Sequence, residues 1–210
     1  MTNVLKVENL SKTFKGKVVF NNISQTFYGG NVYGIIGENG SGKTVFMKCL
    51  CDLLPVDQGN VRFNEQRKAP PKGTFGIIIE APGFLLNFSV YSNLKMLASL
   101  QRKVKKQEII HLLDDVGLSQ DVRKRVGKYS LGMRQRLGIA QAMMDDPPVL
   151  LLDEPFNGLD KNAVQKTYEL IKQLKDKGKI IILASHHSQD IEYLCDFVFE
   201  LMQGKLYVRR

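Results

Sequence analysis

Residues 32–44 read VYGIIGENGSGKT, a short apolar strand pattern followed by a glycine-rich turn and a Lys-Thr pair. Gly37 to Thr44 fit the pattern G-x-x-x-x-G-K-[ST] and stand between a predicted strand and a predicted helix, as this phosphate-binding loop requires. Its glycines let backbone N–H groups wrap a phosphate, while the helix N-terminus and Lys43 supply positive charge. The Thr44 hydroxyl is a candidate Mg²⁺ ligand. We expect a nucleotide to contact Gly37, Asn39, Gly40, Ser41, Gly42, Lys43, Thr44 and Val45.

Strand and helix patterns alternate along the rest of the chain. Apolar alternation before residue 28 predicts antiparallel strands, and short apolar runs predict strands near 59–63, 74–79, 149–152, 179–184 and 197–202. Helical periodicity follows Ser89 and Ser130, and two further predicted helices end at Gly117 and Gly178. This order predicts one α/β domain over residues 1–210: a mostly parallel P-loop NTPase sheet, an N-terminal antiparallel β subdomain, and an inserted α-helical subdomain at approximately 84–146.

A second group of candidate residues follows the apolar run VLLL at 149–152. A strand this apolar belongs in a parallel sheet buried on both faces, whose ligands lie at the carboxyl ends of the strands. Asp153 is therefore a candidate to hold Mg²⁺, and Glu154 is a candidate to polarise a water for attack on the terminal phosphate. His186 follows another predicted strand and reaches the same edge, where it could contact that phosphate. The candidate catalytic residues are Glu154, His186 and Lys43.

Residues 129–136, YSLGMRQR, supply a further motif, which resembles the signature of the ATP-binding cassette family, usually Leu-Ser-Gly-Gly-Gln. The motif order also resembles that family: P-loop, helical segment, signature, the Asp153-Glu154 strand end, residues 157–160 in the place of the D-loop, then His186. The resemblance covers essentially the whole chain. It implies that this protein binds MgATP between two cassettes and hydrolyses it to power a separate partner.

The resemblance also assigns roles to residues outside the P-loop. Ser130 and Gly132, at a helix N-terminus, would bind the γ-phosphate of ATP held by the opposite cassette. Phe14 matches the aromatic position that stacks on adenine, although an ordinary core aromatic at a strand end is the alternative. Asp160 falls in the D-loop and is expected at the nucleotide interface.

Two departures from the family pattern stand out. Leu131 and Met133 replace a Gly and a Gln of the usual signature. Glu80 replaces the usual Q-loop glutamine; its carboxylate could lie near Mg²⁺, but it cannot donate a hydrogen bond. Both departures resemble those of bacitracin- and lantibiotic-type export ATPases.

Composition limits the remaining choices. The 210 residues carry a net charge of +9, with basic clusters at 102–106, 123–125 and 172–179, which we interpret mainly as solvated faces. The longest apolar runs fall far short of the ~20 residues that span a bilayer. No signal peptide pattern opens the chain, and three cysteines fit a reducing compartment better than a disulfide framework. We therefore expect a cytoplasmic protein that reaches the membrane through its permease.

Two function classes stay open. The first is the energising subunit of a transporter, working as a homodimer or paired cassette with a transmembrane permease. The second is a cassette ATPase acting on DNA or ribosomes, but those usually carry coiled coils, zinc insertions or two cassettes, which this chain lacks. A P-loop GTPase or kinase would leave the signature unexplained. We expect the transporter subunit, with ATP and Mg²⁺ as its ligands and no nucleic acid partner.

Overall fold

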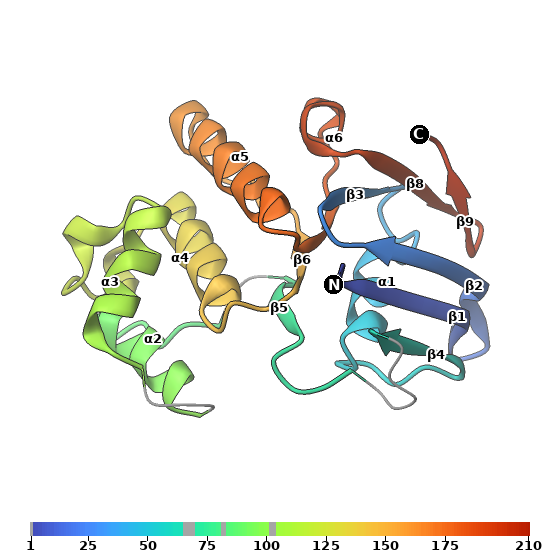
Figure 1. Ribbon diagram of the computed structural model, residues 1–210, viewed down its shortest axis with the longest axis horizontal. Coiled ribbons are helices and arrows are strands. Elements are labelled where there is room, and N and C mark those ends of the chain that lie inside the picture. The colour runs from blue at the N-terminus through green and yellow to red at the C-terminus, as the bar shows by residue number, and fades with distance from the viewer. Residues whose placement is uncertain (1, 65–69, 81–82, 101–103) are drawn as a thin grey trace.

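A six-stranded sheet of order β5-β6-β7-β3-β8-β9 positions the P-loop (Figure 1). The structure is a computed structural model and describes residues 2–64, 70–80, 83–100 and 104–210. Parallel pairing joins the first five of these strands, and only β9 runs antiparallel, against β8. The strands are β3 (Asn31–Ile36), β5 (Phe75–Ile78), β6 (Val149–Asp153), β7 (Ile180–Ala184), β8 (Phe197–Met202) and β9 (Lys205–Val208).

The N-terminal strands form a second, antiparallel sheet of order β2-β1-β4. It consists of β1 (Val4–Phe14), β2 (Lys17–Tyr28) and β4 (Gln58–Phe63). Together, the two sheets confirm the predicted fold class.

Helices connect and cover these sheets (Figure 1). The P-loop leads into α1 (Lys43–Leu50), while α2 (Val90–Ser99), α3 (Lys106–Asp115) and α4 (Leu131–Met143) lie together at one end of the molecule. Two short 3₁₀ turns, Ser119–Asp121 and Val126–Lys128, precede α4. The remaining helices are α5 (Lys161–Asp176) and α6 (Ser188–Leu194). The limits of a helical subdomain at about 84–146 stay a prediction.

The central strands are buried on both faces, as their apolar runs predict. Along β6, Val149 and Leu151 join the core shared with α1 and the antiparallel sheet, whereas Leu150 and Leu152 join the core shared with α4 and α5. Alternation of side chains along a strand separates the two cores in this way. Both cores therefore fix the carboxyl end of β6, where Asp153 and Glu154 lie.

Serine caps begin two of the helices at the predicted places. Ser89 Oγ accepts a hydrogen bond from the Ser92 N–H at 3.1 Å, and Ser130 Oγ accepts one from the Met133 N–H at 3.2 Å. Each bond satisfies an amide that the first helical turn leaves without an intrahelical partner. The predicted start of α4 is therefore confirmed together with its physical reason.

Some expectations fall on residues that the structure does not describe. Ala81 and Pro82, which follow Glu80, lie outside the described residues, as do Arg102 and Lys103 of one basic cluster. Within the described ranges, no helix is long and apolar enough to span a membrane.

Candidate functional site

The P-loop turn requires glycine at two positions for steric reasons. Gly37 has φ 146°, and a Cβ there would lie 2.5 Å from the Leu201 carbonyl oxygen. Gly42, the N-cap of α1, has φ 104°, and a Cβ there would lie 2.6 Å from Val19 Cγ1. A side chain at either position would combine an unfavourable backbone conformation with a collision. The turn can therefore bring bare backbone N–H groups toward a ligand.

Two pockets open beside this turn. One, of about 440 Å³, is lined by the predicted residues Gly40, Ser41, Gly42, Lys43, Thr44 and Val45, together with parts of β2 and the β8–β9 turn. The other, of about 700 Å³, is lined by Gly37, Asn39 and His186, among others. The structure thus gathers the expected phosphate-binding residues along one continuous turn.

Lys43 folds over the turn. Its ammonium donates to the Gly37 carbonyl at 2.6 Å and to the Glu38 carbonyl at 3.1 Å. Ser41 Oγ is buried and has no hydrogen-bond partner among the described residues. An unpartnered hydroxyl next to a cation and free helix amides is what an anionic ligand would satisfy. The turn therefore fits a nucleotide phosphate.

Thr44 and Asp153 meet at the end of β6. The Thr44 hydroxyl donates to Asp153 Oδ2 at 2.6 Å, which ties the first turn of α1 to the neighbouring core strand. A hydroxyl beside a carboxylate is the oxygen donor set that Mg²⁺ prefers. These two predicted metal ligands are brought together, and they fit the ion.

Glu80 has a partner that the sequence pattern did not reveal. Its Oε1 lies 2.7 Å from the Lys48 ammonium. Lys48 stands four residues after Thr44 on α1, so the two share one helix face. Glu80 itself adopts φ 64°, an uncommon conformation for a non-glycine residue. The carboxylate that replaces the usual Q-loop amide is thus bound to a cation of α1.

Glu154 and His186 form a pair at the sheet edge. Glu154 Oε2 lies 2.8 Å from His186 Nδ1, and the two side chains keep 29% and 52% of their surface exposed. The Glu154 N–H donates to the Ala184 carbonyl at 2.9 Å, which continues the β6–β7 pairing by one residue. Two candidate catalytic side chains on neighbouring strands are therefore in contact and open to solvent.

Gln135 of α4 is a functional candidate that the sequence analysis quoted without a role. Its amide Nε2 donates to the Glu154 carbonyl at 3.0 Å, and the side chain is buried. Glu154 has φ 50°, so its backbone is held in an uncommon conformation by bonds at both its N–H and its C=O. The only signal in the sequence was that Gln135 lies inside the signature segment.

The signature residues lie elsewhere. Among the described residues, neither Ser130 nor Gly132 lines the P-loop pocket. A Cβ at Gly132 would lie 2.5 Å from the Gly158 carbonyl oxygen, so the start of α4 packs directly on the turn before α5. Ser130 and Gly132 are held at that helix end, apart from the phosphate site of their own chain.

Phe14 and Asp160 have other contacts. The Lys12 ammonium lies 5.2 Å from the centre of the Phe14 ring, which is 43% exposed. Of the residues described, Phe14 lines neither pocket beside the P-loop. Asp160 is the N-cap of α5 and accepts from the Ala163 N–H at 2.9 Å. Their nucleotide roles stay predictions.

A family profile, related sequences and a solved structure that match this chain agree with one another. The profile of a family described as ABC transporter matches residues 20–157. The lantibiotic transport ATP-binding protein SrtF of Streptococcus pyogenes is 36% identical over 209 residues, covering 99% of this chain and 90% of that protein. The bacitracin transport ATP-binding protein BcrA of Enterococcus faecalis is 38% identical over 211 residues, covering 98% and 68%. A solved structure described as an ATP binding subunit of an ABC transporter superposes with a TM-score of 0.87 at 26% identity, covering 97% and 88%.

Proposed function

This chain belongs to the ABC transporter family, and we propose that it is the subunit that binds and hydrolyses ATP to drive a separate transmembrane permease. The contact between Glu154 and His186 beside the P-loop is the observation that supports hydrolysis most directly. We further propose that the whole chain acts as one nucleotide-binding domain, with a helical subdomain at approximately 84–146.

Each site residue has a stated part in this proposal. Lys43 and the P-loop amides hold the phosphates of ATP, while Phe14 stacks on adenine. Glu154 accepts a hydrogen bond from the attacking water, and His186 orients the terminal phosphate. Mg²⁺, held by Thr44 and Asp153, would neutralise charge on the phosphate oxygens.

Glu80 is proposed to contribute less to the metal site than Thr44 and Asp153 do. Because its carboxylate is paired with Lys48, we propose that it acts near the metal site as part of an ion pair. An ion pair there adds less net negative charge beside the phosphates than a free carboxylate would.

Two copies, or two related cassettes, would close the site. Ser130 and Gly132 lie apart from their own P-loop, which supports a role on the ATP of the opposite cassette. Asp160 lies on the neighbouring turn and would face the same interface. The proposal therefore needs a head-to-tail dimer around ATP.

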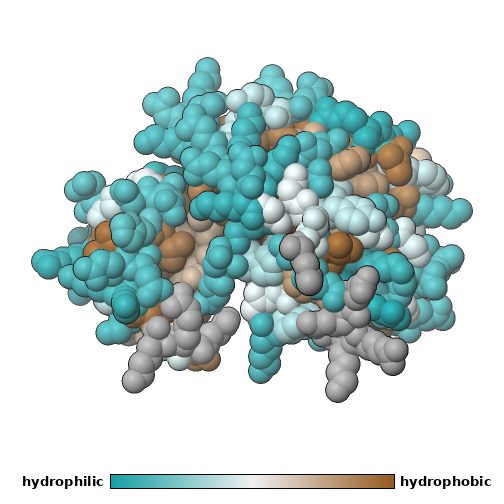
Figure 2. All heavy atoms as spheres, viewed as in Figure 1, coloured by the Kyte–Doolittle hydropathy of each residue, from teal (hydrophilic) through white to brown (hydrophobic). Residues whose placement is uncertain are grey.

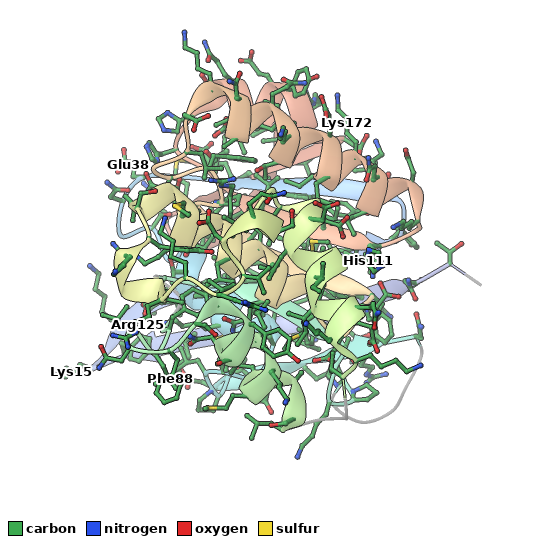
Figure 3. All side chains as sticks on the ribbon, turned by 90° about the vertical axis from the view of Figure 1, so that its left-hand side faces the viewer. Lys15, Glu38, Phe88, His111, Arg125 and Lys172 are labelled. Carbon is green, nitrogen blue, oxygen red and sulfur yellow. The ribbon has the colours of Figure 1, made fainter. Side chains whose placement is uncertain are left out.

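The permease would bind at the helical end of the molecule. Leu85, Leu86 and Phe88 are about half exposed there, and Phe84 packs on the core beneath them. Figure 3 shows Phe88 and Arg125 on the same side of this end, the side that faces away from the viewer in Figure 2. An apolar cluster with a basic neighbour suits a coupling helix of a membrane protein. We propose this cluster as the docking site, at the cytoplasmic face of the membrane.

The transported substrate is proposed by similarity. Because relatives of 36% and 38% identity are named for lantibiotic and bacitracin transport, we propose export of a peptide antibiotic. Selectivity for that cargo would reside in the permease.

The test is direct. The purified chain should bind ATP by calorimetry and release phosphate from MgATP, alone or with its co-purified membrane partner. The control omits Mg²⁺ and should retain little turnover. Binding without any phosphate release under either condition would contradict the proposed ATPase.

A further inference from the structure

Tyr168 of α5 reaches the segment that carries His186 through a buried carboxylate. The Tyr168 hydroxyl donates to Asp190 Oδ1 at 2.5 Å, and the Ser185 hydroxyl donates to Asp190 Oδ2 at 2.7 Å. Asp190 is 6% exposed and Ser185 is 4% exposed. Each carboxylate oxygen therefore has a hydroxyl donor where water hardly competes, which makes both bonds strong and directional.

This network fixes the backbone on both sides of His186. Ser185 Oγ accepts a hydrogen bond from the His187 N–H at 3.1 Å, so the residue before His186 is tied to the residue after it. The His187 carbonyl in turn accepts from the Asp190 N–H at 3.2 Å. The His186 side chain is left to point outward toward Glu154 from a turn that has little freedom.

Tyr168 also contacts the other catalytic segment. Its ring packs edge-on against Phe156, with ring centres 5.1 Å apart at 80°, and Phe156 follows Glu154 by two residues. Burial raises the pKa of the Tyr168 hydroxyl above its ordinary value, so the group stays a donor at neutral pH. One side chain of α5 therefore touches the segments that carry Glu154 and His186.

Tyr193 offers a comparison within the same cluster. Its ring packs on Tyr168 with centres 4.8 Å apart, and the Lys172 ammonium lies 3.8 Å from its own ring centre. No bond between the Tyr193 hydroxyl and Asp190 is present in the described part of the chain. Removing this hydroxyl alters the cluster without breaking the link to Ser185.

We propose that Tyr168, Asp190 and Ser185 are positioning residues that hold His186 against Glu154 in the orientation that ATP hydrolysis needs. The inference rests on the proposed ATPase function. Of the described residues, Tyr168 and Asp190 line neither pocket beside the P-loop, whereas Ser185 lines the larger one beside His186. The Ser185 hydroxyl donates to Asp190, so all three side chains act through the placement of His186. Loss of the link should affect the chemical step more than ATP binding.

The experiment compares Tyr168→Phe and Asp190→Asn with Tyr193→Phe as the matched control, in the full chain. We expect the first two variants to lower kcat about tenfold while KM for ATP stays within about twofold, since a misplaced catalytic group costs rate rather than affinity. The double variant should resemble either single one, because the residues act as a unit. Tyr193→Phe should retain wild-type kcat.

A second readout does not depend on turnover. The ring signals of His186 in nuclear magnetic resonance, assigned with His186→Ala, should shift in Tyr168→Phe and Asp190→Asn but not in Tyr193→Phe. Equal kcat and equal His186 signals in Tyr168→Phe and Tyr193→Phe would overturn the inference. If the wild-type chain hydrolyses no ATP, the proposed function fails, and the His186 signals still decide whether the network positions that ring.

Discussion

Glu154 Oε2 and His186 Nδ1 lie 2.8 Å apart across the carboxyl ends of β6 and β7. When Nδ1 carries the proton, the ring donates to the carboxylate and its Nε2 faces away from that bond. The carboxylate thus orients the ring, and the ring in turn restricts the carboxylate. The pair couples the residue proposed to act on water with the residue proposed to act on the phosphate.

Glu154→Gln should bind ATP but hydrolyse it at least about 100-fold more slowly, because the amide is a far weaker proton acceptor than the carboxylate. The ATP-bound dimer should then persist. Phosphate release and size-exclusion chromatography with MgATP measure the two effects. Turnover at the wild-type rate would remove Glu154 from its proposed role.

Lys43→Ala should weaken ATP binding by about 10- to 100-fold, since the phosphates lose a charge-assisted bond. Calorimetry with ATP provides the measurement. Lys106→Ala, which removes an exposed lysine of α3, is the control and should bind ATP like the wild type. Equal affinities in both variants would contradict the assignment.

Asp153→Asn should raise the Mg²⁺ concentration needed for half-maximal hydrolysis about tenfold, because the ion loses a negatively charged neighbour. Glu80→Gln should raise it much less, since Lys48 already pairs with the Glu80 carboxylate. A magnesium titration of both variants separates the two residues. A larger effect from Glu80→Gln would instead make Glu80 the dominant metal ligand.

Gly42→Ala should destabilise the fold by about 1–3 kcal/mol, because an alanine at φ 104° is strained and its Cβ would meet Val19. Thermal unfolding should show the loss, together with weaker ATP binding. The control is Gly83→Ala, where an added Cβ meets no described atom within 4 Å. Identical unfolding curves for the two variants would refute the steric argument.

Phe88→Ser should reduce co-purification with the permease while leaving ATP affinity unchanged, because the side chain lies on the proposed docking cluster, away from the P-loop. Leu53→Ser removes another half-exposed apolar side chain, three residues beyond the end of α1, and serves as the control. Loss of ATP binding together with permease binding would count against a docking role.

The sequence could predict the elements whose causes are local. The apolar run at 149–152 and the serine caps at Ser89 and Ser130 depend on neighbours in the chain, and the structure confirms them. The signature segment could predict the family because it adds a second, ordered motif.

Contacts between distant residues could not be predicted in this way. The pairing of Lys48 with Glu80 joins positions 32 apart, and nothing in the local pattern of either residue marks the other as its partner. Gln135 likewise reaches Glu154 only because α4 packs on the sheet against β5, the strand next to β6. Such contacts depend on how the helices pack on the sheet. The periodicity of the sequence predicts that the helices form but does not specify this packing.

The tight approach of Gly132 to Gly158 couples two segments that would face the second cassette. With no room for even a methyl group between them, a tilt of α4 toward the turn before α5 would push that turn along. The two segments would then leave or rejoin the opposite ATP together. In the proposed dimer, a movement of α4 would therefore change the contacts of both segments with the ATP of the opposite cassette at the same time.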